Sequence, residues 1–143
     1  MSKWHFQFNI DVDAPNRLVY VKIYGIWRED TAHDYLEVFK KEVTPIIENP
    51  WARLVDLSNW KTASDEVIAV IGEHIEWCAE NNCAIAAYII DNPITYGQLM
   101  QMIEKGQAKE SSKTFRTRAE AERFLQEQGY AIGVSRDDKT IFK

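Results

Sequence analysis

The sequence predicts a single α/β domain with a mainly parallel sheet, an N-terminal antiparallel hairpin and about four helices. Two segments that alternate apolar and polar residues, 4–10 and 17–27, flank a turn-rich stretch and predict the hairpin. Segments with helical apolar spacing then alternate with short strands, which is typical of parallel βα units. Residues 83–90 form a continuous apolar run, as expected of a strand buried on both faces of such a sheet.

The length and composition are those of one globular domain. The chain has 143 residues, of which 45% are hydrophobic and 27% charged. Its net charge of -5 disfavours a nucleic-acid partner. The start Met-Ser-Lys-Trp-His lacks an apolar signal core, and the run 84–90 is too short to cross a bilayer, so we expect a cytoplasmic protein without an integral membrane segment. Cys78 and Cys83 make no disulfide framework and are expected to be reduced thiols.

The second strand of the predicted hairpin has one apolar and one mixed face. Val19 and Val21 share the apolar face, whereas Tyr20 and Tyr24 lie on the opposite side. We expect that opposite side of the sheet to be only partly covered. Gly25, near the strand end, suits a bulge or a close approach by another segment.

Four later segments open with a threonine-based capping box and continue with helical apolar spacing. The boxes begin at Thr31, Thr62, Thr95 and Thr117. Pro45 predicts either a kink in the first helix or its end near Val43. The strands between and around these helices are predicted at residues 52–57, 83–90 and 113–116. The domain then comprises residues 1–128, and residues 129–143 form an extension that is a tail or a small hairpin.

The segment 52–60 is the expected centre of any site. Its apolar strand leads into polar residues that we expect to form a loop at the carboxyl edge of the sheet, where open α/β sheets meet ligands. Trp27 and Trp60 follow parallel strands at the same edge, and they either form an apolar rim there or complete the core. The residues predicted to bind a ligand or partner are Trp27, Asp56, Ser58, Asn59, Trp60, Ser64 and Asp91.

Three chemical alternatives remain open for these and nearby residues. Asp56 and Asp91 end two neighbouring strands, so their carboxyl groups either approach one another or each brace their own loop. Ser58 could join a histidine and an aspartate in a hydrolase triad.

His74, Cys78 and Cys83 could bind zinc, or the two cysteines could pack as small hydrophobes. Their spacing matches no standard zinc motif. We predict neither a metal nor a cofactor.

Several residues resemble the SpoIIAA-like group, which is related to STAS domains. They are Gly25-Ile-Trp27, Pro50-Trp51 leading into Leu54-Val55-Asp56-Leu57-Ser58, and the closing segment from Phe115 to Leu125. The resemblance covers residues 4–127 and implies a βα superhelical fold. In the best-known branch it implies a noncatalytic regulator with a phosphorylated serine in a strand-to-helix loop. Ser58 and Ser64 are the serines of the matching part, although the Asp-Ser-Ser-Gly motif of that branch is absent.

Together these features predict a noncatalytic regulatory or ligand-binding module that acts at the carboxyl edge of the sheet. Its partner would be a protein or a small apolar, lipid-like or anionic ligand. The alternatives are a small hydrolase that uses Asp56, Ser58 and Asp91, and a lipid-binding carrier. A homodimer formed through the first strand or the face of Tyr20 and Tyr24 is compatible with each of these.

Overall fold

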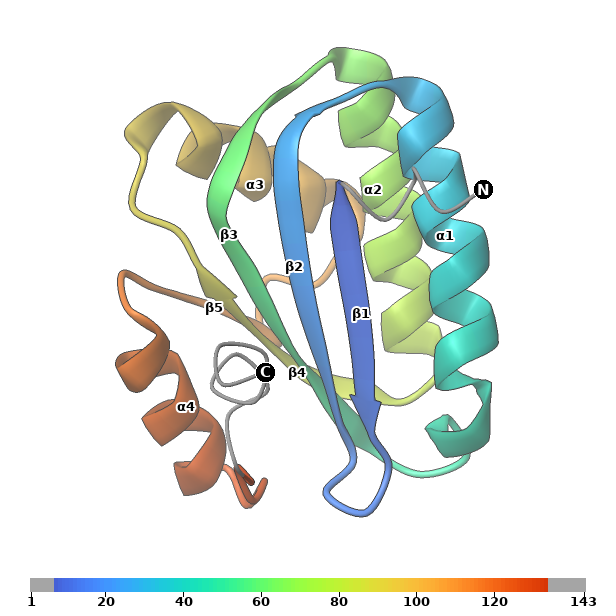
Figure 1. Ribbon diagram of the computed structural model, residues 1–143, viewed down its shortest axis with the longest axis vertical. Helices are drawn as coiled ribbons and strands as arrows, with labels where there is room; N and C mark the ends of the chain where they lie inside the picture. The colour runs from blue at the N-terminus through green and yellow to red at the C-terminus, as the bar shows by residue number, and fades with distance from the viewer. Residues whose placement is uncertain (1–6, 134–143) are drawn as a thin grey trace, which may run out of the picture.

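The computed structural model describes residues 7–133 and contains five strands, four α-helices and one 3-10 helix (Figure 1). In chain order they are β1 (Phe8–Asp13), β2 (Leu18–Trp27), α1 (Glu29–Val43), η2 (Thr44–Ile46), β3 (Trp51–Ala63), α2 (Asp65–Glu80), β4 (Cys83–Ile89), α3 (Pro93–Lys105), β5 (Ser112–Phe115) and α4 (Arg118–Glu127). No helix in this part of the chain is long and apolar enough to cross a membrane.

The strands form one sheet in the order β1-β2-β3-β4-β5. β1 pairs with β2 in the antiparallel sense, and every other pair is parallel. The predicted fold class, a mainly parallel α/β sheet with an N-terminal hairpin, is confirmed. α1, α2 and α3 cover one face of the sheet, and α4 lies on the other (Figure 1).

The sheet separates two hydrophobic cores of unequal size. The larger core fills the space between the sheet and α1, α2 and α3, and it includes Trp51 and Val55 from the first half of β3. The smaller core lies under α4 and includes Leu54 from the same strand, together with Ala121 and Leu125 from the helix. Because alternate residues of β3 enter different cores, this strand is buried on both faces along its first half.

The hairpin differs from the prediction in its boundaries. β1 begins at Phe8 and continues to Asp13, so three residues predicted as turn belong to the strand. Trp4 and Phe6, predicted in the same strand, lie outside the described residues. Gly25 has a φ of +70° beside a register shift between β2 and β3, but the additional residue of that bulge belongs to β3 and not to the strand of Gly25.

The face of Tyr20 is more covered than predicted. Tyr20 is buried in the smaller core, and the Arg118 guanidinium lies 5.9 Å from the centre of its ring. Tyr24 is half-buried. The predicted extension at 129–143 falls mostly outside the described residues.

The helix starts were only partly predicted. Thr117 caps α4 as expected, with its Oγ1 accepting a hydrogen bond from Glu120 N at 3.2 Å. The boxes at Thr31, Thr62 and Thr95 are wrong. Their helices begin after Arg28, Ser64 and Asn92, respectively. α1 ends at Val43, one of the two outcomes predicted from Pro45.

Candidate functional site

The carboxyl ends of β2, β3, β4 and β5 lie at one edge of the sheet because these strands are parallel. The edge is staggered: Trp27 pairs with Ala63 at the end of β3, whereas Ile89 at the end of β4 pairs with Asp56. Residues 57–63 of β3 therefore extend beyond β4, by roughly 20 Å at about 3.3 Å per residue. The ends of β2 and β4 therefore lie at the same edge of the sheet, but β2 ends farther along the strand direction than β4 does.

The predicted polar loop after Leu57 is strand, because β3 continues to Ala63. Its pairing with β2 contains two register shifts in this part, each with an additional residue in β3. Such bulges redirect the side chains that follow them, so Leu57 and Trp60 both enter the larger core although two polar residues separate them. In the sequence, the bulges interrupt the alternation of apolar and polar residues, and such an interruption looks the same as the end of a strand.

Asp56 and Ser58 are brought together at this bulge. One carboxylate oxygen of Asp56 accepts hydrogen bonds from Ser58 N, at 2.9 Å, and from Ser58 Oγ. The contact braces the backbone, as short acidic side chains commonly do. Of the two histidines within residues 7–133, His33 is exposed on α1 and His74 is buried in α2, and no described hydrogen bond joins either to Ser58. The triad arrangement therefore gains no support from the described residues.

Trp27 and Trp60 are both buried in the larger core, so they form no exposed apolar rim. Trp27 Nε1 donates to the carbonyl oxygens of Gln7 and Tyr24, at 3.1 Å each. Its ring packs edge-on against Tyr35, with 5.3 Å between the ring centres. These contacts agree with the alternative that the two tryptophans complete the core.

Ser64 and Asp91 lie in separate surroundings. Ser64 Oγ caps α2 by accepting a hydrogen bond from Val67 N at 3.3 Å. Asp91 is exposed in a groove of about 370 Å³ between the ends of β4 and β5 and the start of α3. Side chains along this groove include Asp91, Asn92, Tyr96, Phe115 and Arg116. Of the predicted site residues, the structure joins Asp56 to Ser58 and places Trp27 and Trp60 along one internal cavity.

The three exposed large hydrophobic side chains of the described residues all lie at this carboxyl edge. Ile26, next to the end of β2, is 60% exposed, and Ile94 and Tyr96, near the start of α3, are 72% and 43% exposed. We define the carboxyl-edge surface as these three residues together with the groove beside Asp91. Ile94 and Tyr96 were not predicted as surface residues. The signal that could have found them is Asn92-Pro93, a cap followed by proline at the first helical position.

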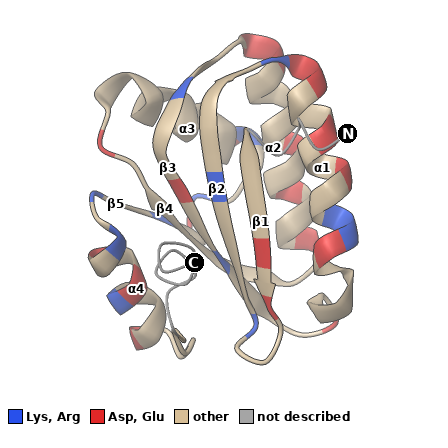
Figure 2. Cartoon of the chain, viewed as in Figure 1, with Lys and Arg blue, Asp and Glu red and all other residues tan. Residues whose placement is uncertain are grey.

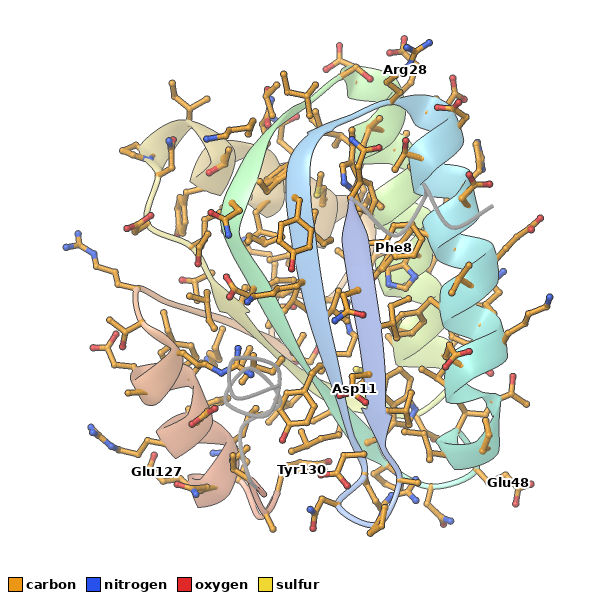
Figure 3. All side chains as sticks on the ribbon, in the orientation of Figure 1. Phe8, Asp11, Arg28, Glu48, Glu127 and Tyr130 are labelled. Carbon is orange, nitrogen blue, oxygen red and sulfur yellow. The ribbon has the colours of Figure 1, made fainter. Side chains whose placement is uncertain are left out.

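Acidic side chains border this surface. Glu29 and Asp30 lie in the first turn of α1, and Asp65 and Glu66 in the first turn of α2 (Figure 2). Carboxylates are favoured there because a helix carries partial positive charge at its amino end. Two exposed cations interrupt the border: Arg28, at the junction of β2 and α1 (Figure 3), and Lys61, near the end of β3. The border is therefore mainly negative.

A cluster of buried polar side chains lies on the helix-covered side of β3 and β4. Arg53 Nη2 donates to Tyr88 Oη at 3.1 Å, and His74 Nε2 lies 3.7 Å from Cys78 Sγ. Burial raises the pKa of Cys78 to about 12 and, with the nearby charge of Arg53, holds the pKa of His74 well below its ordinary value. Both groups are therefore neutral at pH 7.

The zinc alternative gains no support from this cluster. Within residues 7–133, no three His, Cys, Asp or Glu side chains converge closely enough to hold a metal. His74 and Cys78 are in contact, whereas the Cys83 thiol donates to Ile85 O at 3.5 Å. The two cysteines are both buried, as small hydrophobes would be.

Comparison with known proteins identifies the fold. No protein-family model matches the sequence, and no curated protein matches it either. Among solved structures, an uncharacterized DUF3478-family protein with a SpoIIAA-like fold from Shewanella loihica PV-4 is similar, with a TM-score of 0.60 and 12% identity over 83% of this chain and 93% of that one. The protein has a SpoIIAA-like fold.

A second similar structure is an anti-sigma factor antagonist from Mycobacterium paratuberculosis. Its TM-score is 0.57, with 13% identity over 84% of this chain and 95% of the other. The resemblance inferred from the sequence is thus confirmed at the level of the fold. At these identities, the SpoIIAA-like proteins share the arrangement of elements with this chain, and function has to be argued from its own residues.

Proposed function

We propose that the protein is a noncatalytic regulatory module that binds a protein partner through the carboxyl-edge surface. The observation that carries this proposal is that Ile26, Ile94 and Tyr96, the exposed large hydrophobics of the described residues, all lie at the carboxyl edge of the sheet. Exposed apolar residues beside a groove and rimmed by polar groups are typical of interaction sites. A protein of the same fold is described as an anti-sigma factor antagonist, which is by name a regulator.

The partner's surface should match the chemistry of this edge. An apolar segment would cover Ile94 and Tyr96, while the groove would receive side chains near Asp91 and Arg116. Basic residues at the rim of the partner's surface would face the acidic first turns of α1 and α2. Asp56 and Ser58 would serve this surface indirectly, by fixing the bulge of β3.

Site-specific photocrosslinking in cells that naturally express the protein tests the proposal. A photoreactive phenylalanine analogue placed at Ile94 should give a crosslinked product of discrete mass. The double substitution Ile94→Asp, Tyr96→Ser should weaken binding of the captured partner by about 30-fold or more, as expected when an apolar anchor of about 2 kcal/mol is lost. Both side chains are exposed, so the free energy of unfolding should change by only about 0.5 kcal/mol.

Glu48 provides the matched control position. It is exposed beyond the far end of α1, away from Arg28 and the carboxyl edge (Figure 3). The same analogue at Glu48 should not give the product. Equal crosslinking from both positions would contradict a localised site. A product with twice the mass of the chain would show that the surface binds a second copy of this protein instead of a different partner.

A further inference from the structure

Arg53 is a buried cation without a described anionic partner. Its side chain leaves β3 near the start of the strand, points toward the helix-covered core and is 3% exposed. Nη2 bonds to Tyr88 Oη, and the guanidinium lies 5.6 Å from the centre of the Tyr88 ring, but Nε is buried without a hydrogen-bond acceptor. None of the described salt bridges involves Arg53. Burying a guanidinium in this way costs considerable free energy unless an anion compensates it.

The ionisable groups around Arg53 do not supply that anion. Tyr35, Cys78 and Tyr88 each have a pKa raised by burial, so none carries negative charge near neutral pH. His74 is neutral as well, and its Nδ1 is the second buried atom of the cluster without a partner. In the tautomer in which Nε2 accepts the thiol proton of Cys78, Nδ1 carries the ring hydrogen and is a donor.

Arg53 and His74 line a shared internal cavity. It has a volume of about 30 Å³, about twice what one buried water needs. Tyr35 and Tyr88 also line it, and the rest of the lining consists of apolar residues of β2, β3, α2 and α3. The cavity therefore combines a fixed positive charge, unused N–H donors and room for a few heavy atoms.

We infer that this cavity is a binding site for a small monovalent anion, either a halide or a short carboxylate, held by the Arg53 guanidinium with the His74 imidazole as a second donor. A carboxylate would accept hydrogen bonds from Nε and from the remaining N–H of Nη2, in the paired geometry that arginine offers. The site lies inside the domain and is independent of the proposed carboxyl-edge surface.

Thermal unfolding with added anions tests the inference. In a chloride-free buffer of constant ionic strength, sodium formate or sodium chloride should raise Tm saturably, by roughly 10 °C at a concentration about 100 times Kd. In Arg53→Met the anion-dependent rise should disappear, because the charge and donors are gone while the volume is nearly kept. A larger rise in Tm with formate than with chloride would identify the bound anion as a carboxylate. A larger rise with chloride would identify it as a halide.

Arg123→Met is the matched control, because Arg123 is exposed on α4. It should keep the full anion-dependent rise. Equal rises in the wild type and in Arg53→Met would overturn the inference. A second measurement needs no substitution: the ¹⁵N–¹H signal of Arg53 Nε should shift saturably as formate or chloride is added to the wild-type protein, and an unchanged signal would overturn the inference as well.

Discussion

Arg53 and His74 are buried polar side chains that come from β3 and α2 and line one cavity in the larger core. Arg53 stands between Ala52 and Leu54 in a strand predicted to be apolar, and a cation in such a strand is itself a signal of a buried polar site. Its partners come from other elements: Tyr88 lies 35 residues away, and His74 comes from α2. The sequence contains each residue but not the distances between them, so the cluster could not be predicted.

His74 should make the protein sensitive to mild acid. Its pKa in the folded state lies well below the ordinary value of 6.5, first because of burial and then because of Arg53 and Lys40. As the pH falls below about 6.5, the unfolded chain binds a proton at this histidine before the folded chain does. The free energy of unfolding should then fall by up to about 1.4 kcal/mol per pH unit.

Urea denaturation of wild type and His74→Phe at pH 7.5 and pH 5.0 checks this expectation. Phenylalanine can keep the ring contacts with Tyr35 and Phe39, which lie 4.8 and 4.6 Å from the imidazole between ring centres. The loss of stability between the two pH values should be smaller in this variant. His33→Gln removes an exposed histidine and should retain the wild-type loss, whereas identical losses in all three proteins would show that His74 is not responsible.

At the level of elements, sequence periodicity predicted the helices and strands better than their ends. All five strands and four α-helices were expected, because apolar periodicity reflects which face is buried. The end of β3 was missed because its bulges break the alternation. Two helix starts were misplaced because a neighbouring residue, Ser64 or Asn92, serves as the cap, and the start of α1 was misplaced because that helix begins after Arg28 without a side-chain cap. The predicted site depended on where the strands and helices end, so its exposed residues were the part of the site that the sequence predicted least well.

The contact between α2 and α3 depends on glycine at its closest approach. A Cβ added to Gly106 would lie 2.6 Å from Ile75 Cγ2 and 2.9 Å from Gly72 O. We therefore expect Gly106→Ala to destabilise the protein by about 1–3 kcal/mol through overpacking. Gly97→Ala is the control, because Gly97 is exposed within α3 and a Cβ there meets nothing within 4 Å.

Gly97→Ala should instead stabilise the protein by about 0.5–1 kcal/mol, since alanine is the better helix former. Urea denaturation of both variants measures the two changes. Similar effects of the same sign would show that the close approach at Gly106 is not tight.

The whole molecule is asymmetric about its sheet. On one face, α2 packs between α1 and α3, and the three helices bury the larger core. On the other face, α4 packs against β3, β4 and β5 over the smaller core (Figure 1). An element that shares fewer interfaces can open without disrupting the rest. We therefore expect α4 to open at a lower free energy than the global unfolding that exposes α2.

Native-state hydrogen exchange in two core variants tests this division. Leu99→Ala, in the larger core, should lower the free energy of global unfolding by about 2–5 kcal/mol and so reduce protection of α2 amides. It should leave the opening free energy of α4 unchanged, because the larger core stays intact when α4 detaches. Leu125→Ala, in the smaller core, should reduce protection of both helices, because Leu125 becomes exposed both when α4 opens and when the whole domain unfolds. If Leu99→Ala reduced protection of α4 and α2 equally, the two faces would unfold as one cooperative unit.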